Sequence, residues 1–403
     1  MAGLLKGVKV VETGVLMVVD YLGRLLGDEG ADVVKVESPQ LGDYLRNILS
    51  GFGPDWSTKH MMLNRNKRSL TCDAKTVEGR EILSRLIAEA DVFITGNIGD
   101  TNDRLGLDYQ SVKAINPDIV YCQATGFGAS GPYSAVPTHG NMMDALGGGA
   151  APMAVDDGGF VVATGDPVGS SPGVVLGPLY AAVGVLAGLV RARTSGEGCY
   201  IDVSCADAVI ASKWLFGLEM LNPAKVDPAM NRATGDGSGS SKYQFYETKD
   251  GKFILFCAIE AKFWTHWCEA VGRPDLLGEH RSDLVVDFGD GDANLRLEIQ
   301  KVFHTKTQTE WMEIAIDHDT AMGPALRFDE IQTDPHLEAR QQIVTEQHPV
   351  FGDILTFGEP ILVPGEEFHL RSAPTHGQHT EEVLMELGYD EGAVVKLRTA
   401  GIV

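Results

Sequence analysis

The sequence has little positive charge, and this shortage excludes several partners. Its 403 residues carry 33 Lys and Arg against 56 Asp and Glu, giving a formal net charge of −23 and a pI near 4.8. Nucleic acid and anionic membranes attract proteins through a positive field, so we expect neither as a partner. An anionic ligand would have to meet a local group of basic side chains.

Paired cysteines and spaced histidine ligands are also missing. The 6 cysteines form no C-x-x-C pair, and the 11 histidines form no H-E-x-x-H or similar spacing. We interpret the cysteines as reduced side chains that pack like small hydrophobes, and we expect no metal site. The N-terminus lacks the apolar core of a signal peptide, and we find no apolar run near membrane-spanning length. A cytoplasmic protein is expected.

What the chain does contain is a regular alternation of strand and helix patterns. Strands are expected at 8–12, 31–37, 91–95, 119–124 and 200–203, with helical periodicity between them. This alternation predicts an α/β fold with a Rossmann-like, doubly wound parallel sheet. The first turn, Thr13-Gly14-Val15-Leu16-Met17, is not G-x-G-x-x-G, so a nicotinamide or flavin cofactor is not indicated.

The pattern changes near Pro223, which predicts a second domain. We expect a large domain over 1–224, a smaller α+β domain over 225–330, and a segment over 331–403 that returns to the large domain. Lys249-Asp250-Gly251 lies between two apolar runs and predicts a hairpin. Long helices are expected at about 179–193 and 206–221.

Several spaced motifs occur in order between Leu63 and Pro132. They are Asn66-Lys67-Arg68-Ser69-Leu70, Ala90-Asp91-Val92-Phe93-Ile94, Asp103-Arg104-Leu105-Gly106-Leu107, Asn116-Pro117-Asp118-Ile119-Val120-Tyr121 and Gly126-Phe127-Gly128-Ala129-Ser130-Gly131-Pro132. With the upstream run Gly30 to Glu37, this series resembles the class III CoA-transferases (CaiB/BaiF), a family that also contains α-methylacyl-CoA racemase. The resemblance extends from about Leu4 to the C-terminus. It implies a coenzyme A thioester and a carboxylic acid as substrates, no permanently bound cofactor, and an interlocked dimer.

The resemblance also implies a binding site for CoA. The corresponding positions are Arg104, Lys75, Asn97 and the turn Thr125-Gly126-Phe127. Guanidinium and backbone N–H groups suit the phosphates of CoA. Two departures weaken this site: Gly96-Asn97-Ile98-Gly99-Asp100 lacks an Arg that the family usually has there, and Ser38 stands where a basic residue often follows the strand.

In the family's transferases an Asp attacks the acyl-CoA carbonyl, and the local match here is Asp166 in Thr164-Gly165-Asp166-Pro167. Counting back from the following helix without a gap puts Gly173 at that position instead. Either the loop holds about seven extra residues and Asp166 is the nucleophile, or the chain is a pseudo-catalytic subunit of a heteromeric transferase. Succinyl-CoA:benzylsuccinate CoA-transferase is a family example with two related subunits. As a third interpretation, Asp166 is only a turn residue.

His139 supports another alternative. It falls where the family's racemases place a catalytic His, and with Asp166 it could supply the base and acid of a 2-methylacyl-CoA racemase. The racemases usually follow that His with Asp, whereas this chain has Gly140. We therefore expect a CoA-transferase first, a racemase second, and a CoA-holding partner subunit as the non-catalytic alternative.

Overall fold

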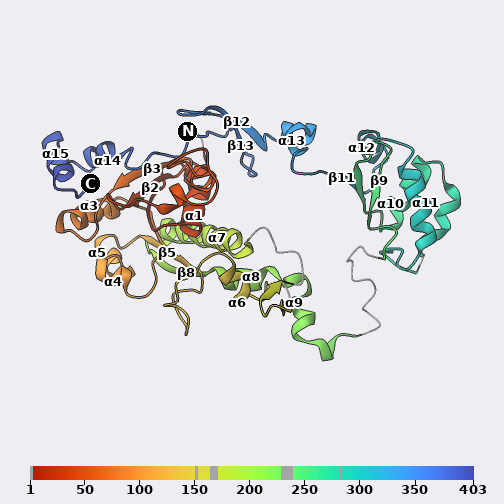
Figure 1. Cartoon of the computed structure of the whole chain (residues 1–403), viewed down its shortest axis with the longest axis horizontal. Helices are drawn as coiled ribbons and strands as arrows, with labels where there is room; N and C mark the ends of the chain where they lie inside the picture. The colour runs from red at the N-terminus through yellow and green to blue at the C-terminus, as the bar shows by residue number, and fades with distance from the viewer. Residues whose placement is uncertain (1–2, 150–152, 164–170, 228–238, 282) are drawn as a thin grey trace. The chain divides into compact units, whose positions relative to one another are not determined.

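The structure is a computed structural model that describes residues 3–149, 153–163, 171–227, 239–281 and 283–403. The chain forms two compact units. Unit 1 comprises Met1–Gly217 together with Gln341–Val403, and unit 2 comprises Leu218–Arg340. Figure 1 labels many of the helices and strands of both units. The sequence placed the small domain at 225–330, so unit 2 is longer than that range at both ends.

A six-stranded parallel sheet organises unit 1, with the strand order β3-β2-β1-β4-β5-β8. The strands are β1 (Lys9–Thr13), β2 (Asp32–Glu37), β3 (Lys67–Thr71), β4 (Val92–Thr95), β5 (Val120–Thr125) and β8 (Cys199–Ser204). Strand β1 pairs in parallel with β2 on one side and β4 on the other. The Rossmann-like parallel sheet that the sequence predicts is therefore confirmed.

Helices cover both faces of this sheet. The helices up to residue 221 are α1 (Met17–Asp28), η1 (Tyr44–Asn47), α2 (Thr58–Asn64), α3 (Val77–Ala88), α4 (Thr101–Leu105), α5 (Tyr109–Ile115), α6 (Asn141–Leu146), α7 (Pro172–Ser195), α8 (Cys205–Ser212) and α9 (Trp214–Leu221). A short antiparallel hairpin, β6 (Met153–Val155) with β7 (Val161–Ala163), follows α6.

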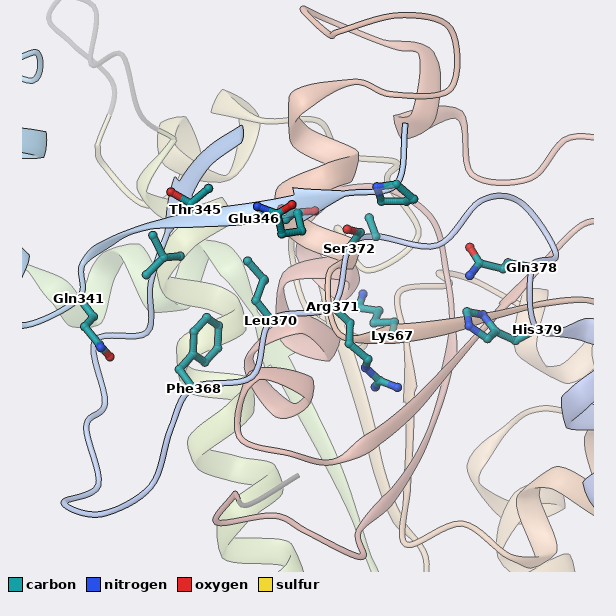
Figure 2. A pocket seen from close by; sticks show the side chains of 14 residues that line it. Lys67, Gln341, Thr345, Glu346, Phe368, Leu370, Arg371, Ser372, Gln378 and His379 are labelled. Carbon is teal, nitrogen blue, oxygen red and sulfur yellow. The ribbon is translucent and has the colours of Figure 1, made fainter. Parts of the chain in front are cut away.

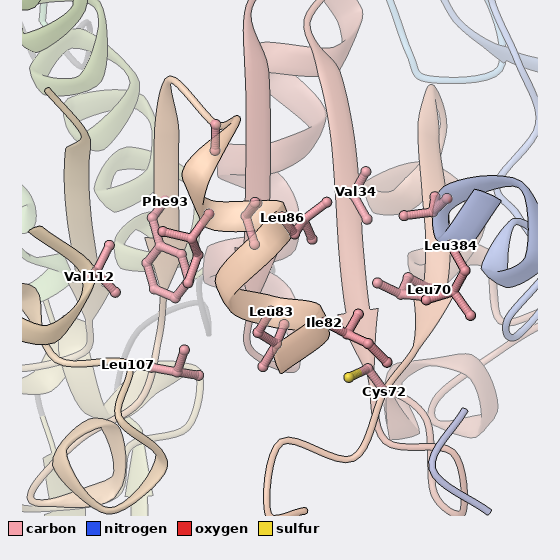
Figure 3. Close-up of a cluster of buried hydrophobic side chains, with 14 of the residues drawn as sticks. Val34, Leu70, Cys72, Ile82, Leu83, Leu86, Phe93, Leu107, Val112 and Leu384 are labelled. Atoms are coloured by element: carbon pink, nitrogen blue, oxygen red, sulfur yellow. The ribbon is translucent and has the colours of Figure 1, made fainter. Parts of the chain in front are cut away.

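Each face of the sheet has its own apolar core. On one face α3 contributes Ile82, Leu83 and Leu86, which lie against side chains of the strands such as Phe93 (Figure 3). On the other face α1 and α7 pack over the inner strands, with Leu22 and other α1 residues fully buried. Because both faces are covered, the strands read as nearly continuous apolar runs, as parallel strands usually do.

The C-terminal segment of unit 1 closes the α3 face. It contains β12 (Ile343–His348), β13 (Gly352–Phe357), α14 (Thr380–Glu386) and α15 (Glu391–Thr399). The backbone N–H of His379 donates to Ser69 O at 2.9 Å, and Leu384 is buried in the same core as the strands. Helices α14 and α15 both contribute buried side chains to this core.

Helix α7 differs from the sequence prediction, because it begins at Pro172 rather than near 179. Gly177 and Pro178 in its second turn are weak helix formers, which is why the start was missed. The glycine has a packing role: a Cβ on Gly177 would lie 2.4 Å from Cys205 Sγ of α8. Gly177 therefore allows the two helices to approach closely.

The expectation that the chain has no apolar run of membrane-spanning length is wrong for α7. Helix α7 has 24 residues and is long and apolar enough to cross a membrane, judged by length and composition alone. In this structure one face of α7 packs on the sheet through Ala181, Val185 and Leu189. Its apolar character is thus explained in part by burial in the core.

The helix predicted over 206–221 is two helices, because α8 ends at Ser212 and α9 starts at Trp214. Helix α9 buries none of its residues. Its apolar side chains therefore have no core to fill within the described part of the chain.

Unit 2 is built around an antiparallel sheet of β11 (Met322–Ala325), β10 (Phe253–Phe256) and β9 (Gln244–Glu247). Strands β9 and β10 form the hairpin predicted around Lys249-Asp250-Gly251. Its helices are η2 (Pro223–Lys225), α10 (Ala261–Ala270), η3 (Pro274–Glu279), α11 (Ala293–Phe303), α12 (Gln308–Asp317), η4 (Ile331–Thr333) and α13 (Pro335–Ala339). Trp264, Trp267 and Trp311 form the centre of its core.

A cluster of buried charges ties β1, β2, β3 and α1 together in unit 1. Lys35 Nζ lies 3.1 Å from Glu12 Oε1 and 2.9 Å from Asp43 Oδ2, and it also contacts Asp20. Lys67 Nζ lies 2.8 Å from Glu12 Oε2 on the other side. Burial alone would lower the pKa of Lys35, but the surrounding carboxylates outweigh it and raise that pKa well above its usual value. Burial raises the pKa of Asp20.

This cluster predicts a large effect of Lys35→Met on stability. Removing the ammonium leaves buried carboxylates without their cation, which costs about 3–5 kcal/mol. The matched control is Lys9→Met: Lys9 pairs with Glu89 at 2.7 Å, but its side chain is 52% exposed, so about 0–1 kcal/mol should be lost. Urea unfolding followed by circular dichroism measures both. Equal losses in the two variants would contradict a dominant role of the buried cluster.

Candidate functional site

The strand order places a crevice at the carboxyl edge of the sheet. The connection that leaves β1 leads to β2 on one side and the connection that leaves β4 leads to β5 on the other, so the two connections run in opposite directions. Open α/β sheets bind ligands at such a switch point. A cavity of about 380 Å³ lies there, and Leu16 after β1, Gly96 after β4 and Thr125 at the end of β5 line it.

Most side chains around this cavity are apolar. They come from the turn before α1, from α1 itself, from η1 and the residues after it, and from α6 and α7: Val15, Leu16, Met17, Val18, Val19, Ile48, Leu49, Met143 and Val174. The polar side chains are those of Tyr44, Thr125, Thr138 and His139. The cavity is therefore a lipophilic space with a few hydrogen-bonding groups, as ligand pockets usually are.

Two leucines of the cavity wall have strained backbones. Leu16 has φ 71° and Leu49 has φ 63°, a region that L-residues with large side chains rarely adopt. The Leu16 N–H donates to the carboxylate of Asp43 at 3.1 Å, and Asp43 in turn contacts Lys35 of the buried cluster. Burial would raise the pKa of Asp43, but the charge of Lys35 and the hydrogen bonds that the carboxylate accepts from Leu45 N–H and Lys35 together outweigh it and lower that pKa. Strain of this kind persists only where surrounding contacts enforce it, and it gathers at functional sites.

Thr125 lines the cavity and carries a hydroxyl that forms no hydrogen bond with the described residues. Its side chain is buried, and Oγ1 has no hydrogen-bond partner in the described part of the chain. A buried hydroxyl without a partner costs about 1–3 kcal/mol, so a ligand atom that pairs with it gains correspondingly. Gly126 follows directly, where a Cβ would lie 2.0 Å from Thr138 Oγ1. The glycine allows the 138–139 segment to reach this edge.

His139 lies at the same cavity. It precedes α6, with Gly140 at the N-cap in a positive-φ conformation (37°). The ring is exposed, so it is accessible to a ligand in the cavity. The structure thus brings His139 together with Thr125 and Gly126, as a shared site requires.

The first turn of α7 reaches the cavity through Val174. Gly173, the position that an ungapped count assigns to the nucleophile, carries no carboxylate, but its N–H donates to Asp144 Oδ1 at 2.7 Å. Ser171 Oγ donates to Asp144 Oδ2 at 2.5 Å. Asp166 lies outside the described residues. A buried carboxylate is therefore present beside the start of α7, contributed by α6.

The remaining CoA candidates do not line this cavity. Arg104 on α4 pairs with Asp100 at 3.2 Å and is 67% exposed, and Lys75 is exposed as well. Asn97 donates to Asn102 Oδ1 at 2.9 Å, and the Phe127 ring packs beside Tyr133. Both side chains are exposed on the surface of unit 1. Their assignment to CoA stays a prediction.

Some residues of the site were missed by the sequence analysis. Asp144 lies among apolar residues of a short helix, and no spacing indicates that it meets α7. Leu16 and Leu49 look like ordinary core residues, because a strained φ leaves no trace in composition. Only the absence of G-x-G-x-x-G after β1 indicated that this turn is unusual.

A larger cavity of about 620 Å³ lies elsewhere in unit 1, beside β12 and the segment 368–373 (Figure 2). Its basic groups are engaged by the fold: Arg371 donates to Asn66 O at 2.9 Å, and His379 Nδ1 accepts from the Ser69 N–H. None of the predicted site residues lines it. Within the described ranges, no group of three or more His, Cys, Asp or Glu side chains is placed to hold a metal ion.

Known proteins are similar to this chain over nearly its whole length. The chain is 28% identical to the formyl-CoA:oxalate CoA-transferase of Escherichia coli O157:H7 (strain EC4115 / EHEC), over 98% of both chains. It is 28% identical to the enzyme of the same name from Rhodopseudomonas palustris (strain BisA53), over 94% of this chain and 92% of that protein.

Solved structures show the same architecture. A CaiB/BaiF family protein from Brucella suis superposes with a TM-score of 0.72 at 26% identity, covering 96% of this chain and 100% of that chain. Rv3272 from Mycobacterium tuberculosis gives a TM-score of 0.73 at 22% identity, covering 94% and 99%, and shares the fold. The profile described as CoA-transferase family III matches residues 5–380. The chain belongs to CoA-transferase family III.

Proposed function

We propose that this protein moves coenzyme A from an acyl-CoA donor to a free carboxylic acid in the cytoplasm. The observation that carries the proposal is the convergence of Thr125, His139 and the first turn of α7 on one cavity at the switch point of the sheet. Membership of the family supports the reaction type. A thioester whose acyl group enters the cavity would have its carbonyl within reach of these groups.

The proposed nucleophile is Asp166. Its carboxylate oxygen attacks the donor carbonyl, the C–S bond breaks, and CoA thiolate leaves a mixed anhydride. The thiolate then attacks the aspartyl carbonyl, which releases the donor acid and leaves CoA as an enzyme thioester. The acceptor carboxylate attacks that thioester, and returning CoA thiolate takes the acceptor acyl group and regenerates Asp166. Every bond broken is balanced by one formed, so no further reactant is needed.

We expect Asp166→Asn to abolish transfer while acyl-CoA binding is retained. The matched control is Asp157→Asn, an exposed carboxylate in the preceding hairpin turn, which should keep full activity. Hydroxylamine added during turnover should convert the enzyme thioester to a hydroxamate at Asp166, visible by peptide mass spectrometry. A hydroxamate on Asp144, or on a co-purifying related chain, would reject Asp166 as the nucleophile.

CoA binding is proposed to use Arg104. A charge-assisted contact between guanidinium and phosphate contributes about 1.5–3 kcal/mol, so Arg104→Ala should weaken CoA binding about 10-fold or more. Arg191 is a suitable control, because it is also exposed and paired, with Glu197 at 3.0 Å. Calorimetric titration with CoA measures both variants. If both bind CoA like the wild type, Arg104 is only a surface ion-pair residue.

A racemase acting on 2-methylacyl-CoA is the second candidate, and the placement of His139 at the cavity favours it. That reaction exchanges the α-proton of the acyl group without moving CoA. Incubation in deuterated water with a 2-methylacyl-CoA and a labelled free acid separates the two activities, since only a transferase moves the label into thioester.

We propose that the protein works as a dimer, with a second copy or a related subunit covering apolar surface. The outer face of α7 exposes large hydrophobic residues: Leu179, Tyr180, Val183, Leu186 and Val190. Helix α9 adds further exposed side chains, with Trp214 and Phe216 among them. Exposed apolar area of this extent usually marks an interface.

Sedimentation at micromolar concentration should therefore give twice the chain mass of 43.4 kDa. Val183→Glu, on the exposed face of α7, should shift the protein toward monomer, because it places a charge in the interface. Val395→Glu on α15, similarly exposed, should leave the dimer intact. A wild-type monomer would contradict the homodimer, and dimerisation only after co-expression with a related chain would favour the heteromer.

A further inference from the structure

The cavity at the switch point has a chemical character that limits its ligand. Among the described residues that line it, none is Asp, Glu, Lys or Arg. A carboxylate held in a protein is normally paired with guanidinium, ammonium or several N–H donors, because an unpaired buried charge is strongly disfavoured. The only titratable side chains on this wall of described residues are those of His139 and Tyr44.

The size of the cavity favours a larger hydrophobic ligand. Its volume of about 380 Å³ falls within the range of pockets that enclose drug-sized ligands, roughly 300–1,000 Å³. A formyl or oxalyl group would leave most of the apolar wall without contacts. Val15, Met17, Ile48 and Leu49 instead offer surface that only a larger hydrophobic group can cover.

Thioester chemistry separates two classes of acid. A monocarboxylic acid loses its charge when it becomes a thioester, because its only carboxylate forms the new bond to sulfur. An oxalyl thioester keeps a second, ionised carboxylate. A neutral acyl group suits an apolar wall, whereas the oxalyl group would carry its anion into it.

We propose that this cavity accepts the acyl group of an apolar monocarboxylic acid, aliphatic or aromatic, and discriminates against formyl and oxalyl groups. The inference rests on the proposed function in so far as the ligand is a CoA thioester. The thioester group lies beside Thr125, and the hydrocarbon part lies against the residues on either side of the strained Leu16 and against Leu49.

Binding of a thioester series to the wild-type protein tests the acyl class directly. Calorimetry compares acetyl-CoA, hexanoyl-CoA, 3-phenylpropanoyl-CoA and oxalyl-CoA. Each buried methylene strengthens binding about fourfold, so hexanoyl-CoA should bind at least about 10-fold more tightly than acetyl-CoA. Phenylpropanoyl-CoA should also bind more tightly than acetyl-CoA, and oxalyl-CoA less tightly. Equal affinity across the series, or tightest binding of oxalyl-CoA, would overturn the inference.

A charge placed in the wall provides a second test. Val15→Asp should reduce the advantage of hexanoyl-CoA over acetyl-CoA by about 10-fold, since the acyl chain would lie beside a carboxylate. Val15 is 48% exposed, and the control Val395→Asp on α15 changes a residue that is 58% exposed and lines none of the described cavities. An unchanged chain-length preference in a folded Val15→Asp protein would place the acyl group elsewhere.

Transfer assays keep this inference separate from the proposed function. Turnover of hexanoate or 3-phenylpropanoate at a kcat/KM at least about 10-fold above oxalate supports both. Transfer to oxalate with the higher kcat/KM supports the transferase and rejects the apolar acyl class. Chain-length-dependent binding without transfer to any acid keeps the acyl class and rejects the transferase.

Discussion

The buried ammonium of Lys35 is the interaction on which the carboxyl edge of unit 1 depends. It joins Glu12 of β1, Asp20 of α1 and Asp43 of the loop before η1 at one point. The Asp43 carboxylate also accepts a hydrogen bond from the N–H of Leu16, which lies in the strained turn that lines the cavity. A charge cluster inside the sheet thus determines the shape of an apolar wall at its edge. Removing one partner of a buried ion pair is costly, but replacing the whole pair by well-packed apolar residues often costs no stability, so we assign this cluster a role in geometry.

A second buried ion pair, between Arg46 and Glu37, fixes another part of the cavity wall. Arg46 of η1 donates to both oxygens of Glu37 at the end of β2. Burial would raise the pKa of Glu37, but Arg46 and Lys35 lower it to about 2. His60 on α2 faces Arg46 at 2.9 Å, and burial together with that charge lowers the pKa of His60 to about 3. The helix η1, whose Tyr44 lines the cavity, is therefore held by a bidentate ion pair that does not itself touch the ligand.

The fold could be predicted from the sequence to a much greater extent than the site. The sequence shows the alternating strands and helices directly through the periodicity of their apolar residues. It shows the hairpin at Lys249-Asp250-Gly251 through its turn residues. The start of α7 could not be read, because Gly177 and Pro178 disfavour a helix that tertiary packing against Cys205 enforces. The site depends on backbone strain and on contacts between distant segments, such as Asp144 with Gly173. Only the family resemblance pointed to the turn of Thr125 and Gly126, which lines the cavity.

The choice between two carboxylates follows from what the proposed reaction demands. A nucleophile that must attack a thioester needs an unshared electron pair and access to the carbonyl. Asp144 is buried, and both of its oxygens accept hydrogen bonds, one from the Gly173 N–H and one from Ser171. Such donors stabilise the anion and reduce its reactivity, while they fix the first turn of α7 against α6. Asp144 is therefore better suited to positioning the cavity wall than to attack, which leaves the attacking role to a carboxylate such as Asp166.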